Sequence, residues 1–248
     1  MPIDTAGQQP AVFDASLASF EASGIECDFM AGHSLGSYAA LVAVGAIGAE
    51  AARRVVTVRG KAMADAGREH PGSMIALLGC GSERAREVAR EFGLTLANDN
   101  APGQAVLSGA TDAIAAIAAA DPTYTDDEGK ERRIRLKQLP VSGAFHSPLM
   151  EPAAERLAAA IAAERFGDGS RVIANGTARP YVDPARELAD ELLQPVRWRE
   201  TLEHLWQQGV REFVEFEPAG VLTGLVRRTL PDAVAVKVED LIGTVRGR

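Results

Sequence analysis

The chain has 248 residues, of which 46% are hydrophobic and 24% are charged, and its formal net charge is −8. This length and apolar content are enough for one large globular domain or two small ones. The acidic balance argues against a general nucleic-acid-binding role, because affinity for phosphates is built from clustered lysine and arginine. No stretch approaches the ~20 consecutive apolar residues of a membrane-spanning helix, so we expect no membrane insertion.

Features that report on the cell compartment are few. The first ten residues lack the basic and apolar regions of a signal peptide. The two cysteines, Cys27 and Cys80, lie in apolar surroundings without the spacing of a metal or redox site. We therefore expect structural thiols in a reducing compartment, the cytoplasm, and no bound metal.

The N-terminal segment predicts helices around one short buried strand. Apolar periodicity and breakers predict a helix over 10–22, a strand over 27–31, and helices over 38–46 and 50–66. Between the strand and the second helix stands the sequence GHSLG, residues 32–36. The order is therefore a strand, a tight turn and a helix in immediate succession.

In the middle of the chain the predicted order of helices and strands changes. The pattern predicts strand 74–78, helix 82–92, strands 94–97 and 105–108, helix 111–119 and strand 134–139. This β-α-β-β-α-β order is ferredoxin-like, and the polar stretch 121–131 is expected to be its long exposed loop. We assign residues 71–142 to an inserted ferredoxin-like subdomain.

The C-terminal segment again alternates predicted helices and strands. Here the pattern predicts helix 149–163, strand 171–175, helices 185–193 and 198–208, strand 212–217 and helix 222–230. The predicted fold class is α/β: a parallel-sheet, α/β-hydrolase-like core formed by residues 1–70 and 143–248, interrupted by the inserted subdomain.

The sequence GHSLG fits the G-x-S-x-G nucleophile elbow, in which a sharp turn exposes the serine, here Ser34. A serine hydroxyl is a weak nucleophile, so the fold must supply a base and amide donors for the developing oxyanion. The N–H of Leu35, at the helix start, is the natural first donor. The motif also arises by chance in a chain with 24 glycines, but the flanking strand and helix favour a catalytic role.

The candidate base is one of only four histidines. His146 lies in the loop SGAFHSPLM between a predicted strand and helix, where α/β folds tend to place catalytic groups. His33 adjoins the serine and is expected to line the pocket, whereas His70 and His204 have unremarkable settings. A plain loop histidine is the alternative for His146.

Arg59 lies among apolar residues at helical spacing, so we expect its guanidinium to be partly buried. A buried arginine needs an anionic partner. One interpretation is a salt bridge to an acidic side chain of the protein. The other is bidentate binding of a free carboxylate on a dicarboxylic acyl group such as malonyl.

Several segments together resemble the malonyl-CoA:acyl carrier protein transacylase family and the acyltransferase domains of polyketide synthases. They are QQPA, AGHSLGSYAALVAVGAI, VRGKAM, PGSMIALLG, NDNAPGQAVLSG, GAFHSPLM, QPVRW and EPAGVLTG. The resemblance implies a ping-pong malonyl transfer in which Ser34 is acylated, His146 is the general base and Arg59 holds the malonyl carboxylate.

The resemblance also assigns supporting roles. It implies that a main-chain carbonyl in the segment beginning at Glu191 orients the histidine, and that the bulky ring of Phe145 favours malonyl over methylmalonyl. It places Asn100, Gln104 and Arg135 toward the pantetheine arm or the carrier, although ordinary loop and strand roles are the alternative. The implied partners are malonyl-CoA and an acyl carrier protein, with no cofactor besides these substrates, in a monomer or a synthase complex.

The chain departs from the family pattern in one missing segment and at two residues. Family members open with a strand and a G-Q-G-S-Q-like loop whose glutamine N–H is the second oxyanion donor. Nothing before Gln8 matches that loop, so we expect a truncated gene model, a fragment, or a divergent form that pairs with another chain. In addition, Ser37 stands where the family commonly has Glu, and Glu191 stands where it often has Gln.

Two alternatives to the transferase remain open on the sequence: an acyl hydrolase on the same scaffold, and a noncatalytic remnant that serves as a docking module. A basic run stands out on this acidic chain, formed by Lys130, Arg132, Arg133, Arg135 and Lys137. Because carrier proteins are acidic, this run is a candidate docking face, with a solvated strand edge as the alternative.

Overall fold

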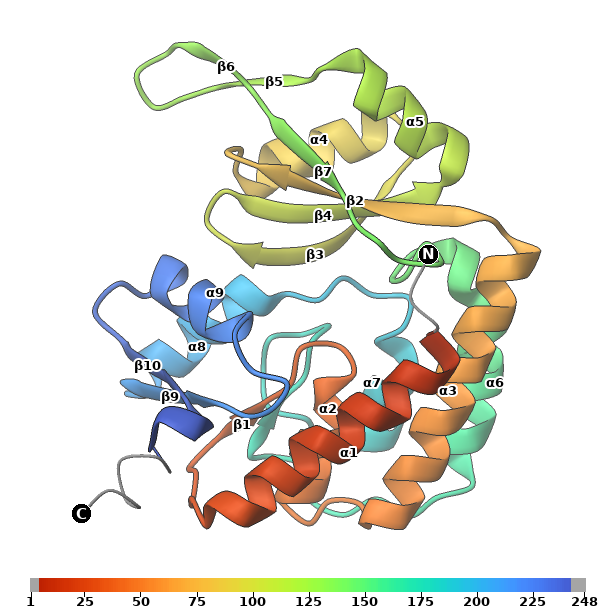
Figure 1. Ribbon diagram of the computed structural model, residues 1–248, viewed down its shortest axis with the longest axis vertical. Helices are drawn as coiled ribbons and strands as arrows, with labels where there is room; N and C mark the ends of the chain where they lie inside the picture. Colours follow the sequence, from red (N-terminus) through yellow and green to blue (C-terminus); the bar gives the residue numbers. More distant parts are fainter. Residues whose placement is uncertain (1–4, 242–248) are drawn as a thin grey trace.

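The computed structural model describes residues 5–241, which form two parts, one above the other in Figure 1. The α/β class predicted from the sequence is confirmed. The lower, larger part contains α1 (Thr5–Ser23), β1 (Met30–Ala31), α2 (Gly36–Ala43), α3 (Ala49–Glu69), the 3-10 turn η1 (Pro148–Met150), α6 (Glu151–Ala162), β8 (Val172–Ile173), α7 (Pro184–Asp190), α8 (Trp198–Gln207), β9 (Glu212–Glu215), α9 (Leu222–Thr229) and β10 (Val234–Lys237). Within residues 5–241, no helix is both long and apolar enough to cross a membrane.

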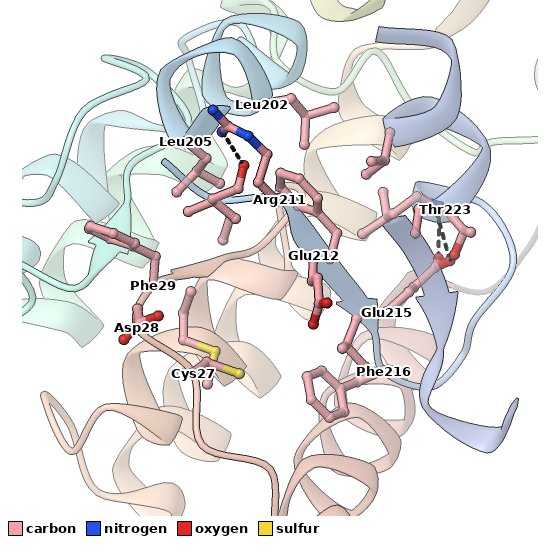
Figure 2. A pocket seen from close by; sticks show the side chains of 18 of the residues that line it. Cys27, Asp28, Phe29, Leu202, Leu205, Arg211, Glu212, Glu215, Phe216 and Thr223 are labelled. Carbon is pink, nitrogen blue, oxygen red and sulfur yellow. Dashed lines mark hydrogen bonds between the residues drawn. The ribbon is translucent and has the colours of Figure 1, made fainter. Parts of the chain in front are cut away.

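The strands of the larger part pair in parallel. β1 pairs with β8, and β9 pairs with β10, a strand that the sequence pattern did not predict. The two pairs are separate sheets. Between β1 and β9 lies a cavity of about 510 Å³, with Cys27 and Asp28 on one side and Glu212 and Glu215 on the other (Figure 2).

Helices build most of the core of the larger part. α3 packs against both α1 and α6 (Figure 1). Its buried face carries Val55, Val56, Arg59 and Met63, at the three- and four-residue spacing of one helix face. Burial of each large apolar side chain contributes about 1.5–3 kcal/mol, so this packing fixes the helix and the arginine it carries.

The upper part holds β2 (Gly72–Leu78), α4 (Ser82–Glu91), β3 (Thr95–Ala101), β4 (Gln104–Ala110), α5 (Thr111–Ala120), β5 (Thr123–Thr125), β6 (Glu131–Arg133) and β7 (Arg135–Gln138). Its four-stranded antiparallel sheet has the order β3-β4-β2-β7, as a ferredoxin-like β-α-β-β-α-β unit requires. α4 and α5 lie on the side of this sheet away from the larger part (Figure 1). The subdomain limits at residues 71 and 142 stay a prediction.

The stretch 121–131, predicted as a long exposed loop, is instead largely a short hairpin. β5 and β6 pair in antiparallel fashion, with Thr123 beside Arg133. The turn forms because one carboxylate oxygen of Asp126 accepts hydrogen bonds from the N–H groups of Glu128 and Lys130. Gly129 closes the turn with a φ of 76°.

The two parts are joined close to the candidate site. The N–H of Asp99 in β3 donates to the carbonyl of Val196 over 2.9 Å, and the Val196 N–H donates to Ala97 over 2.8 Å. Asp99 is buried and forms an ion pair with Arg199 of α8. The inserted sheet is therefore attached to the segment immediately after the carbonyls that hold His146.

Candidate active site

Ser34 occupies a strained turn between β1 and α2. Its φ of 52° lies in the left-handed region, which residues other than glycine seldom adopt. A Cβ on Gly32 would overlap the backbone of Gly36 and Ser37, whereas a Cβ on Gly36 would meet nothing within 4 Å. Only the first glycine of the motif is therefore required by close backbone approach. The Leu35 N–H donates to no group within residues 5–241, so it is free for an oxyanion.

Ser34 and His146 meet, although they are 112 residues apart in the chain: Ser34 Oγ lies 2.8 Å from His146 Nε2. On the far side of the ring, His146 Nδ1 donates to the carbonyls of Glu191 (3.1 Å) and Gln194 (3.0 Å). Because both of these partners are acceptors, Nδ1 carries the proton and Nε2 can accept one from serine. Two main-chain carbonyls thus stand where many serine enzymes have a carboxylate.

The imidazole of His146 is held neutral. Burial, followed by the positive charge of Arg59 and the nearby His33, lowers the pKa of His146 to about 3. The side chain is only 4% exposed. A neutral imidazole whose acceptor nitrogen faces a serine hydroxyl has the arrangement of a general base.

Arg59 approaches the same hydroxyl from α3. Its Nη2 donates to Ser34 Oγ over 2.8 Å, and its Nη1 donates to Gln9 Oε1 over 2.7 Å. The residue is 4% exposed, and burial lowers the pKa of its guanidinium. Among the residues described, it forms no ion pair with any carboxylate, so no salt bridge within residues 5–241 accounts for its burial. A buried cation that lies beside a nucleophile and has no paired anion in the described part of the chain is suited to an anionic substrate group.

A cavity of about 340 Å³ adjoins the elbow and is lined by His33, Leu35, Asn100 and Gln104. His33 Nε2 lies 2.8 Å from Asn100 Oδ1, and because an amide oxygen is an acceptor, His33 donates this hydrogen bond. Burial lowers the pKa of His33, which keeps a second positive charge away from the base. The structure thus brings four of the predicted pocket residues to one cavity.

Two predicted residues lie elsewhere. Phe145 packs against apolar clusters on both sides of the junction and lines neither the 340 Å³ cavity nor the space around Ser34. Arg135 is exposed on β7, the edge strand of the inserted sheet. A role for Phe145 in acyl selection and contact of Arg135 with the pantetheine arm stay predictions.

Residues that sequence reasoning did not single out complete the site. Gln9 holds Arg59, and Asn175 Oδ1 accepts the Ser34 N–H over 3.1 Å. One signal for Asn175 was available, because it lies at the carboxyl end of a predicted strand, 171–175, and the elbow directly follows another. Parallel strands bring such ends to one edge of a sheet. Ser37 and Glu191, the two residues that depart from the family pattern, are also in contact: Ser37 Oγ lies 3.4 Å from the Glu191 carboxylate.

Comparison with known proteins identifies the family. Residues 3–247 match the family described as acyl transferase domain. Malonyl CoA-acyl carrier protein transacylase of Bacillus subtilis is 38% identical, over 95% of this chain and 76% of that protein. The polyketide biosynthesis protein PksC of the same organism, also named a malonyl CoA-acyl carrier protein transacylase, is 35% identical over 92% of this chain and 80% of its own length. The crystal structure of MCAT from Streptococcus pneumoniae matches with a TM-score of 0.87 at 31% identity, covering 99% of this chain and 82% of that one. The chain therefore belongs to the acyl transferase domain family.

Proposed function

We propose that this protein transfers a malonyl group from malonyl-CoA to the phosphopantetheine thiol of an acyl carrier protein, through a malonyl ester on Ser34. The observation that carries the proposal is Arg59, a buried guanidinium 2.8 Å from the nucleophile with no carboxylate partner in residues 5–241. A short dicarboxylic acyl group bonded to Ser34 Oγ would bring its free carboxylate to this cation. The names of the B. subtilis relatives support the same reaction.

In the first half-reaction, Ser34 Oγ attacks the thioester carbonyl while its proton moves to His146 Nε2. The Leu35 N–H, at the start of α2, donates to the oxyanion that develops. Collapse of the tetrahedral intermediate breaks the C–S bond, and the proton on Nε2 goes to the departing thiolate of coenzyme A. Arg59 Nη2, which donates to Ser34 Oγ in the free protein, then donates to the malonyl carboxylate.

In the second half-reaction, the thiol of the carrier's phosphopantetheine arm takes the place of coenzyme A. His146 Nε2 removes the thiol proton, the sulfur attacks the ester carbonyl, and the same proton returns to Ser34 Oγ as the ester bond breaks. Throughout, the carbonyls of Glu191 and Gln194 keep the ring oriented through Nδ1. The sequence of steps requires that coenzyme A leaves before the carrier reacts.

Intact-mass spectrometry of the carrier protein tests this proposal. The protein is mixed with malonyl-CoA and holo carrier protein, with Ser34→Ala as the control. We expect the carrier to gain one malonyl group, and only with the unaltered enzyme. Free malonate without malonylated carrier would favour the hydrolase alternative. A folded protein whose Ser34 never becomes acylated would favour the noncatalytic docking module.

The basic run is part of the proposal as the surface that meets the acidic carrier. Its members Lys130, Arg132 and Arg133 already form ion pairs, with Glu128, Asp126 and Asp121 respectively. Arg135 and Lys137 have no ion-pair partner in the described part of the chain. They lie opposite Leu78 and Ala76 of β2. Cross-strand partners point to the same side of a sheet, and Ala76 belongs to the apolar cluster on the face toward the larger part.

The carrier-binding assignment can be tested with two matched double variants. We expect Arg135→Ala/Lys137→Ala to raise the KM for carrier protein several-fold. It removes two unpaired cations, each of which contributes about 0.2–1 kcal/mol to carrier binding. The variant Arg132→Ala/Arg133→Ala should have a smaller effect on this KM. The hydrolysis rate of malonyl-CoA should stay the same in both, and equal effects on KM and hydrolysis would count against docking.

The proposed setting is the cytoplasm. Cys27 and Cys80 are both free thiols, and burial raises the pKa of each. Thiols with raised pKa values are weak nucleophiles and persist in a reducing compartment. Coenzyme A esters and carrier proteins, the substrates of the proposed reaction, would be met in the same place.

A further inference from the structure

A buried polar network lies behind the nucleophile and the base, and the mechanism above uses none of its side chains. At its centre is Glu191, which is 6% exposed and whose carboxylate accepts four hydrogen bonds. Oε1 accepts from the Tyr181 hydroxyl and from the Asn175 N–H, each over 2.6 Å. Oε2 accepts from Asn175 Nδ2 over 3.1 Å and from Ser37 Oγ over 3.4 Å. Every donor that faces this carboxylate is therefore paired with it.

The carboxylate fixes the orientation of the Asn175 amide. Nδ2 donates both to Glu191 and to Ser37 Oγ, so Oδ1 is turned to the opposite side, where it accepts the Ser34 N–H over 3.1 Å. A reversed amide would place its NH2 group against the Ser34 N–H, leaving two donors facing each other. Ser34 has a φ of 52°, so this bond restrains a turn that is unfavourable by itself.

The same residue also holds the base. The main-chain carbonyl of Glu191 accepts from His146 Nδ1 over 3.1 Å. One end of Glu191 therefore restrains the imidazole, and its other end, through Asn175, restrains the nucleophile. Reaction rates are sensitive to displacements of about 1 Å between reacting groups, so both restraints bear on the 2.8 Å contact between Ser34 and His146.

We propose that Glu191 is a positioning residue that acts through Asn175, the carboxylate and the amide forming one unit that holds Ser34 in register with His146. The titratable and charged groups that face this carboxylate are Tyr181, Tyr38 and Arg59. The inference rests on the proposed function only for its substrate, since the positioning concerns any reaction of Ser34.

An exchange of the two groups tests the unit. In Glu191→Gln, a new NH2 group meets the donors of Asn175 and Ser37. In Asn175→Asp, a second carboxylate meets the first. The double variant Asn175→Asp/Glu191→Gln keeps one carboxylate and one amide: an oxygen at position 175 still accepts the Ser34 N–H, and another accepts from the amide at position 191. The oxygen of that amide still accepts from the Tyr181 hydroxyl and the main-chain N–H of position 175.

The readouts are kcat and KM with malonyl-CoA, and the rate at which a fluorophosphonate probe labels Ser34. We expect each single variant to lower kcat and labelling by about 10²-fold with KM within about 3-fold, because geometry is lost and binding groups are not. The double variant should recover to within about 10-fold of the unaltered protein, since its hydrogen bonds are complementary again. The control Tyr181→Phe, which leaves Asn175 paired, should stay within about 5-fold.

The outcomes separate positioning from mere stability. A double variant that folds, by circular dichroism, but labels as slowly as the slower single variant would overturn the proposal. So would single variants that melt at a lower temperature but label at the original rate. If single variants fold poorly, the double variant alone decides, by whether it folds and labels. An unaltered protein that labels with the probe but never takes up malonyl would contradict the proposed function and leave the positioning role intact.

Discussion

Replacement of Arg59 by alanine gives the sharpest prediction about acyl selectivity. The guanidinium is 4% exposed and points two donors into the site, toward Ser34 Oγ and Gln9 Oε1. A hydrogen bond to a charged group contributes about 1.5–3 kcal/mol. A bidentate pair to the malonyl carboxylate therefore contributes about 3–6 kcal/mol, which corresponds to a loss of about 10²–10⁴-fold in kcat/KM.

The assay compares malonyl-CoA with acetyl-CoA in Arg59→Ala, by stopped-flow acylation of Ser34. Acetyl-CoA has no free carboxylate, so its kcat/KM should change by less than about 5-fold and the substrate preference should invert. Arg53→Ala is the matched control, because Arg53 lies on the same helix but is exposed and pairs with Asp14. An equal fall for both thioesters would refute the carboxylate-binding role and leave Arg59 as a structural residue.

Three further predictions follow from the site. Gly32→Ala should abolish probe labelling of Ser34, because a Cβ there overlaps backbone, whereas Gly36→Ala should leave it nearly unchanged; equal losses would contradict the steric argument. Burial raises the pKa of Glu191 to about 7, whereas the low pKa of His146, about 3, keeps that base neutral above pH 3. The acylation rate should therefore rise with pH, with a midpoint near pH 7 that is set by ionisation of Glu191. In Glu191→Gln this midpoint should be absent. The raised pKa also means that the folded state holds the Glu191 proton more tightly than the unfolded state. Its contribution to the free energy of unfolding is therefore full below pH 4.5 and lost by about pH 7. In urea titrations, the difference in free energy of unfolding between the unaltered protein and Glu191→Gln should fall by ~3 kcal/mol across that pH range. An advantage that stays constant or grows with pH would contradict this assignment.

Local signals predicted the nucleophile well. The strand, the G-x-S-x-G turn and the buried helix are contiguous, so the elbow could be recognised without tertiary information. His146 was found by elimination among four histidines and by its loop setting. The burial of Arg59 followed from helical periodicity. The absence of a carboxylate partner among residues 5–241 did not, because it depends on where the tertiary fold places each acidic side chain.

The sequence pattern could not predict the hydrogen-bond network that supports the nucleophile and the base. Asn175 and Glu191 are 16 residues apart, and their contact with the elbow depends on the pairing of β1 with β8, which spans only two residues of each strand. The side to which the Phe145 ring turns was equally hidden, since adjacency in the chain does not fix the direction of a side chain. The β5–β6 hairpin was missed because its strands are only three residues long and polar, although Asp126 and Gly129 carried a turn signal.

Peptide mapping by mass spectrometry after a brief reaction with malonyl-CoA tests the central claim most directly. The account predicts a single malonyl ester, on the peptide that contains Ser34. The ester should be absent in Ser34→Ala and should form more slowly by orders of magnitude in His146→Ala. A malonyl group carried by any other residue, or none on the folded protein, would contradict the account.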